Sequence, residues 1–229
     1  LVGTVIGGGL LGLEAAGALH GLDVDCTVVQ SSDRLMSAQL DRPAGDALRR
    51  LIEARGIGVR TGSITTRLDP DATGQATGLE FRDGSYARTD VVVFTVGVRP
   101  RDELARHAEL RVDPRGGVVI DAACRTSDPR ILAIGEVASF AGQAVGLVAP
   151  GYAMAEVAAT GLLGGDAEFP GFDLSTKLKL SGVDVASFGD AFAQTPGALD
   201  VVYADPIAGV YKKLVLSDDA KTLLGGILV

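Results

Sequence analysis

The sequence is poor in aromatic residues: it has no tryptophan, and phenylalanine and tyrosine together make up 5% of the chain. Small aliphatic side chains must therefore build most of the core, which suits a buried parallel sheet covered by helices. A basic excess is missing as well, because the net charge is −8 with both signs interspersed. We therefore expect neither nucleic acid nor an anionic membrane surface as a partner.

Cysteine is also scarce. Cys26 and Cys124 are the two cysteines, and they form neither a CxxC pair nor a metal-binding pattern. No apolar run reaches the length of a membrane span, and no signal peptide is visible. These absences indicate a reduced, cytoplasmic protein with two ordinary thiols. Both ends of the chain fall within apolar runs, at Leu1 and Val229, and this suggests a fragment of a longer protein.

Strand and helix patterns alternate along the first part of the chain. This order is typical of a βαβαβ unit and predicts an α/β fold with a parallel sheet. The strand over residues 91–96 is apolar throughout, so we expect it to be buried on both faces. An antiparallel meander is predicted over residues 64–89. The other expected strands cover residues 1–6, 24–29 and 57–60, and the expected helices cover residues 10–20 and 42–55.

The pattern changes after residue 101. An alanine-rich helix is predicted over residues 152–163, and a β-rich segment with hairpin spacing follows, which we expect to form a small α+β lobe. The strands expected in this second part cover residues 118–121, 131–134, 178–180, 183–188, 201–203, 210–216 and 223–229.

A glycine-rich turn joins the first strand to the first helix. Gly7, Gly9 and Gly12 fit the spacing G-x-G-x-x-G, in which the glycines allow a tight turn, close approach of a pyrophosphate, and close packing of helix on strand. The alternative is a tight turn without a ligand. The strand–turn–helix context favours a Rossmann-type dinucleotide site. The residues expected to line it are Gly7, Gly8, Gly9, Leu10, Leu11 and Gly12.

The residue after the second strand departs from the pattern of NAD-specific sites. An acid usually stands there and binds the ribose 2′-hydroxyl, whereas this chain has Gln30. An amide does not repel a 2′-phosphate, and Arg34 could pair with one. We therefore expect the protein to use both NADH and NADPH. The alternative is that Asp33 and Arg34 form a solvated loop.

Several segments resemble the flavoprotein superfamily with two dinucleotide-binding domains, which includes disulfide reductases, NADH oxidases and ferredoxin reductases. Those segments are residues 5–14, 93–100 and 126–136. Residues 146–155 and 174–185 are most similar to the reductase module of assimilatory nitrite reductase [NAD(P)H] large subunits. The resemblance covers essentially the whole chain.

The resemblance implies a domain order. Residues 1–97 would form the NAD(P)-binding domain, residues 98–165 the second half of the FAD-binding domain, and residues 166–229 the start of an interface lobe. The first FAD half would be missing from this chain. Sirohaem and an iron–sulfur cluster would belong only to a missing downstream part, because this chain has no cysteine cluster.

The resemblance also implies roles for single residues. Glu14 would lie near the flavin–nicotinamide contact, although an exposed acid in the first helical turn is the alternative. Gly97 would border the nicotinamide nucleotide. Glu136, next to Gly135, would accept a hydrogen bond from the ribityl chain of FAD; the alternative is an acid that caps the next turn. The helix near Gly151 would direct its N-terminus at the flavin.

The function implied is that of an FAD-dependent NAD(P)H oxidoreductase. Electrons would pass to an acceptor domain or a small redox protein, for nitrite reduction, and a homodimer is possible. No side chain is expected to act as acid or base in hydride transfer. One alternative is a stand-alone ferredoxin or rubredoxin reductase, and another is a non-catalytic nucleotide-binding or redox-sensing module.

Overall fold

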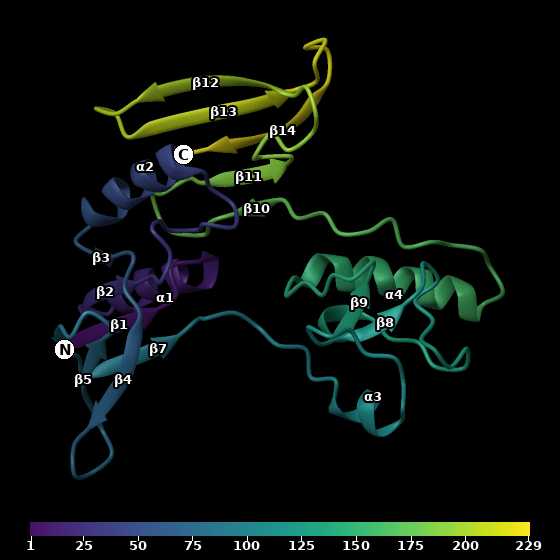
Figure 1. Cartoon of the computed structure of the whole chain (residues 1–229), viewed down its shortest axis with the longest axis horizontal. Helices are drawn as coiled ribbons and strands as arrows, with labels where there is room; N and C mark the ends of the chain where they lie inside the picture. Colours follow the sequence, from purple (N-terminus) through teal and green to yellow (C-terminus); the bar gives the residue numbers. More distant parts are fainter. The chain divides into compact units, whose positions relative to one another are not determined.

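The computed structural model describes all of residues 1–229 and divides the chain into two compact units (Figure 1). The first unit joins residues 1–96 to residues 174–229, and the second consists of residues 97–173. The three-part division implied by the sequence stays a prediction. No helix in the structure is long and apolar enough to cross a membrane.

A parallel four-stranded sheet forms the centre of the first unit, in the order β3-β2-β1-β7. The predicted alternation of strands and helices is confirmed. Helix α2 begins where Asp41 caps it, since the Asp41 side chain accepts a hydrogen bond from the Ala44 N–H. The elements are β1 (Val2–Ile6), α1 (Leu10–His20), β2 (Asp25–Val29), α2 (Arg42–Glu53), β3 (Gly58–Arg60) and β7 (Val91–Phe94).

The predicted meander between β3 and β7 is confirmed as a three-stranded antiparallel sheet in the order β4-β5-β6. Its turns contain Gly74 and Gly84, both at positive φ. Leu79 and Phe81 of β5 pack against Val29 of β2 in a small core of their own. The strands are β4 (Thr65–Pro70), β5 (Ala76–Phe81) and β6 (Tyr86–Arg88).

Strand β7 differs from its prediction. We expected its apolar run to be buried on both faces, but Val91 to Val93 are only half-buried, and Phe94 is 59% exposed. The reason is the strand order: β7 pairs with β1 alone and is the edge of the parallel sheet. The apolar run correctly indicated a strand and wrongly indicated its depth.

The lobe at the end of the chain is a five-stranded antiparallel sheet in the order β10-β11-β14-β13-β12. It shares one hydrophobic core with the parallel domain, in which Leu178 and Ile227 of the lobe join Leu13 of α1 and Leu48 of α2. The strands are β10 (Thr176–Lys177), β11 (Ala186–Gly189), β12 (Leu199–Asp205), β13 (Val210–Leu216) and β14 (Leu223–Leu228).

The second unit is small and has its own core around Met154, Phe140 and Phe169. The strand expected over residues 131–134 is wrong, because Leu132 makes only an isolated bridge there. The strand lies at residues 138–140 instead, and a short helix at residues 103–107 was not predicted. The elements are α3 (Glu103–His107), β8 (Val118–Ile120), η1 (Gly135–Val137), β9 (Ala138–Phe140) and α4 (Val148–Leu162).

The shared core predicts that the lobe stabilises the parallel domain. Replacement of the buried Leu178 by alanine should lower the free energy of unfolding by roughly 2–5 kcal/mol, measured by urea denaturation. The matched control is Leu174→Ala, because Leu174 is exposed in the same segment. Equal stabilities for the two variants would contradict a core shared across the two segments.

Candidate dinucleotide-binding sites

The turn after β1 is closed by contacts that only glycine permits. Gly7 has φ +115°, and its N–H donates a hydrogen bond to the Val29 carbonyl at 2.8 Å. A Cβ atom added at Gly12 would lie 1.8 Å from the Gly7 carbonyl oxygen. Thr95, which the sequence analysis missed, donates its hydroxyl to the same Gly7 oxygen at 3.0 Å. Helix α1 therefore packs directly onto the turn.

The space in front of α1 is open. Gly9 is the N-cap of α1, has no side chain to cap the helix, and would meet nothing within 4 Å if it carried a Cβ atom. The first turn of α1 contains no acidic residue. The backbone N–H groups at a helix start have no partner within the helix and carry the positive end of its dipole. This geometry suits a pyrophosphate.

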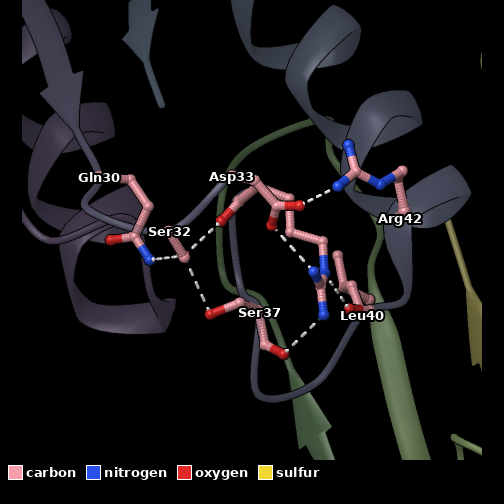
Figure 2. Close-up of polar contacts among 7 residues, drawn as sticks. Gln30, Ser32, Asp33, Ser37, Leu40 and Arg42 are labelled. Atoms are coloured by element: carbon pink, nitrogen blue, oxygen red, sulfur yellow. Dashed lines mark hydrogen bonds and ion pairs between the residues drawn. The ribbon is translucent and has the colours of Figure 1, made fainter. Parts of the chain in front are cut away.

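Gln30 links the glycine turn to the loop that follows β2. Its side-chain oxygen accepts a hydrogen bond from the Gly8 N–H at 2.8 Å, and its amide nitrogen donates to the Ser32 hydroxyl (Figure 2). The side-chain oxygen of Gln30 thus already has a hydrogen-bond partner within the protein. The sequence could not reveal this bond, which joins residues 22 positions apart.

Arg34 binds its own loop. Its Nε donates to the Leu40 carbonyl at 2.9 Å, one terminal nitrogen donates to the Asp33 carboxylate at 2.9 Å, and the other to the Ser37 carbonyl at 3.4 Å (Figure 2). The side chain is 24% exposed. A freely solvated loop, the alternative in the sequence analysis, therefore does not describe Arg34. Pairing with a 2′-phosphate stays a prediction, and fewer of its N–H donors remain for it.

Glu14 lies in the second turn of α1 and is half-buried. Its carboxylate accepts a hydrogen bond from the Lys179 N–H at 3.2 Å, which joins the helix to the lobe. The alternative of an exposed acid in the first turn is therefore wrong. The role near a flavin–nicotinamide contact stays a prediction.

In the second unit, Glu136 lies in the wall of two neighbouring cavities, of about 320 and 360 Å³. It sits in the short helix η1, where Gly135 turns the chain at φ +78°. The structure shows no hydrogen bond from the following turn to the Glu136 carboxylate, so the capping alternative has no support. The lining of the first cavity is Ile134, Gly135, Glu136, Leu147, Val148, Gly151, Tyr152 and Ala155.

The N-terminus of α4 forms one side of the first of these cavities, since Leu147, Val148 and Gly151 all line it. A Cβ atom at Gly151 would lie 3.2 Å from the Gly135 Cα, so the helix and the turn approach closely. No side chain caps α4, and its first turn has no acid. Gly97, at φ +100°, is exposed at the start of the unit.

The two cysteines are buried and free. Burial, with Asp25 nearby, raises the pKa of the Cys26 thiol to about 11. Burial also raises the pKa of the Cys124 thiol. Neither is a reactive thiolate near neutral pH, so this chain offers no thiol for exchange chemistry.

The first unit has a parallel sheet with a glycine turn at an open helix N-terminus, and the second unit has Glu136 in the wall of two cavities. The first of these arrangements is typical of dinucleotide-binding proteins. Residues 3–160 match the family Pyridine nucleotide-disulphide oxidoreductase, and the chain belongs to this family. Its members use FAD and NAD(P)H. The resemblance recognised in the sequence is confirmed.

Among curated proteins, the chain is 50% identical over 227 residues to the nitrite reductase (NADH) large subunit of Escherichia coli (strain K12), covering 99% of this chain and 27% of the relative. It is 52% identical over 227 residues to the nitrite reductase [NAD(P)H] large subunit of Klebsiella oxytoca, covering 99% of this chain and 24% of that relative. The chain thus spans about a quarter of the length of these relatives.

Among solved structures, the chain is similar to an FAD-dependent pyridine nucleotide-disulphide oxidoreductase from Desulfovibrio vulgaris. The TM-score is 0.85 at 28% identity, over 99% of this chain and 59% of that one. The likeness extends over both compact units and confirms the predicted α/β fold with its Rossmann-type domain.

The open space at Gly9 allows a side chain to be added there without a clash. Gly9→Ala should fold normally, since its φ of −86° suits alanine and its Cβ meets no protein atom. The added methyl group would occupy the space a pyrophosphate needs, so the affinity for ADP-ribose should fall about tenfold or more, measured by calorimetry.

The comparison variant is Gly12→Ala, whose Cβ would strike the Gly7 oxygen. We expect it to lower the free energy of unfolding by about 1–3 kcal/mol, because helix and turn must separate. Undiminished ADP-ribose affinity in Gly9→Ala would mean that no phosphate approaches this turn.

Proposed function

We propose that this chain is the NAD(P)H-binding core of a flavoprotein reductase module that moves a hydride from NAD(P)H to FAD and passes the electrons on for nitrite reduction. The observation that carries the proposal is the glycine turn at the open N-terminus of α1. The names of the relatives, which are nitrite reductase large subunits at about half identity, support the choice of acceptor.

In the first unit, the chain's contribution is binding and orientation. The N–H groups of Leu10 and Leu11 at the start of α1 would hold the pyrophosphate, and the missing side chain at Gly9 would admit it. The loop after β2 would receive the adenosine ribose, because that strand end faces it in this fold. Gly97, the residue that follows this part of the chain, would border the nicotinamide.

In the second unit, the residues fit FAD by their chemistry. The Glu136 carboxylate is free to accept a hydrogen bond from a hydroxyl, and Gly135 leaves room beside it. The positive end of α4 would stabilise negative charge on the ring system. FAD, when bound, supplies the acceptor for the hydride and can release electrons one at a time. No side chain of this chain needs to move a proton.

An acceptor domain or a small redox protein would take the electrons. A homodimer fits the exposed apolar side chains of the edge strand β12, among them Leu199, Val201 and Val202. We place the protein in the cytoplasm, because its cysteines are free.

Glu136 provides the test of the flavin site. Glu136→Gln in the flavin-loaded protein should weaken FAD binding about tenfold or more, because a hydrogen bond to a charged group contributes roughly 1.5–3 kcal/mol. FAD release would be measured by the return of flavin fluorescence on dilution. The control is Glu168→Gln, an exposed acid in the same unit. Identical FAD affinity in the two variants would remove Glu136 from the site.

Gln30 provides the test of nucleotide choice. The parent protein should use NADPH within about tenfold of NADH, a gap of roughly 1.4 kcal/mol. Gln30→Glu should shift kcat/KM at least tenfold further toward NADH, because a carboxylate repels a 2′-phosphate while its oxygen can still accept from the Gly8 N–H. The control is Gln39→Glu, the same charge change elsewhere in the loop. A parent that strongly rejects NADPH would contradict this account of the amide.

A further inference from the structure

Asp41 connects the cofactor loop to the lobe. One oxygen of its carboxylate caps α2 by accepting from the Ala44 N–H at 3.1 Å. The other accepts a hydrogen bond from the Tyr211 hydroxyl at 2.9 Å and lies 3.6 Å from the Lys213 ammonium. Tyr211 and Lys213 belong to β13 of the lobe, 170 or more residues further along the chain. The end of the loop is therefore fixed from outside it.

Both partners from the lobe are buried. Tyr211 is 5% exposed and Lys213 is 6% exposed, at positions two apart on one face of β13. A buried ammonium is unfavourable without compensation, and Lys213 finds it in Asp41 and in Asp200, 3.1 Å away. Burial and the hydrogen bond to Asp41 raise the pKa of Tyr211 well above its usual value, so the hydroxyl remains a donor at all working pH values.

Hydrogen bonds connect Leu40, the residue covalently joined to Asp41, back to Gln30. Arg34 donates to the carbonyl of Leu40, the residue next to Asp41, and the Arg34 carbonyl accepts from the Ser32 hydroxyl (Figure 2). Ser32 in turn accepts from the Gln30 amide. A second connection closes the loop, since Arg42 pairs with Asp33.

We infer that Tyr211 and Lys213 of the lobe are positioning residues for the adenosine half of NAD(P)H. They act through Asp41 and through the loop after β2, which the Arg34 side chain holds by its hydrogen bonds. The inference rests on the proposed function. It assigns to the lobe a part in nucleotide affinity, although neither residue touches the nucleotide. All of the residues involved lie within one compact unit.

The contacts of Asp41 with the lobe should affect the affinity for the nucleotide and not the turnover number. A loop that is already fixed loses little conformational entropy when it binds a ligand, whereas a loop loosened at Asp41 must be ordered by the ligand itself. Loss of the Tyr211 hydroxyl should therefore raise the dissociation constant of ADP-ribose and the KM for NADH. It should leave kcat at saturating NADH unchanged.

The experiment is calorimetric titration of ADP-ribose into the flavin-loaded full-length protein, alongside NADH kinetics with a dye acceptor. Tyr211→Phe should bind ADP-ribose about three- to tenfold more weakly, with KM for NADH raised by a similar factor and kcat within twofold of the parent. The matched control is Tyr203→Phe, since Tyr203 is 59% exposed on β12 and its hydroxyl makes no hydrogen bond in the structure. Tyr203→Phe should match the parent in every reading.

A double-mutant cycle tests whether Tyr211 acts on the loop after β2 through Arg34. Arg34→Lys removes the forked contacts to Leu40, Ser37 and Asp33 and leaves only the pair of Arg42 with Asp33, so the Tyr211 hydroxyl should lose most of its influence in that background. We expect Tyr211→Phe to weaken ADP-ribose binding less than twofold when Arg34 is already lysine. Full additivity of the two changes would overturn the coupling through the loop.

The outcomes separate the two proposals. A parent protein that fails to bind ADP-ribose contradicts the proposed function itself. A parent that binds, with Tyr211→Phe less stable but equal in affinity, overturns only the positioning role and leaves Tyr211 a purely structural contact. If Tyr211→Phe does not fold, Asp200→Asn replaces it, because Asp200 is partly exposed and pairs with Lys213, which also lies beside Asp41. Unchanged ADP-ribose affinity in Asp200→Asn would then overturn the positioning role.

Discussion

The contact between Gly12 and the carbonyl of Gly7 is the constraint on which the proposed nucleotide site depends. Any side chain at Gly12 would push α1 away from the turn, because its first atom would lie 1.8 Å from that oxygen. With hydrogen there instead, the helix start sits directly over the end of β1. The unpaired N–H groups of α1 then face the open space beside Gly9, and the dipole of the helix adds to their attraction for phosphate.

The two units have different roles in the proposed function. The first would offer backbone donors and a fixed loop to one dinucleotide, and the second would offer an acid, Glu136, and a helix N-terminus to another. Neither site needs a side chain that transfers protons, which agrees with the chemistry of cofactors that carry the hydride themselves. The lobe belongs physically to the first unit, since its strands complete the core that supports α1 and α2.

Much of this could be predicted from the sequence, for local reasons. Helix α1 and strand β13 have the predicted bounds, because apolar periodicity and glycines at the ends of elements are properties of short segments. Burial depth could not be predicted in the same way: the apolar run at β7 is the edge of its sheet, and strand order is a long-range property. The strand expected over residues 131–134 failed because a short β-branched and aliphatic run does not by itself supply a partner.

The same difference between local and long-range features applies to the candidate site. The glycine turn was visible in the sequence because its residues are close together, whereas Thr95, which bonds Gly7, is 88 residues away. Arg34 was assigned a possible ligand from its charge alone, but its donors meet carbonyls of its own loop. Glu14 was expected near a cofactor, and its bond to the Lys179 N–H links it to the lobe. Charged side chains have many potential partners, and only the fold selects among them.

The most direct test of the central claim is a crystal structure of the protein with ADP-ribose bound. We expect a pyrophosphate oxygen to lie within hydrogen-bond distance of the backbone N–H of Leu10 or Leu11, with the ribose against the loop after Gln30. A nucleotide bound elsewhere, with the start of α1 left to solvent, would contradict it.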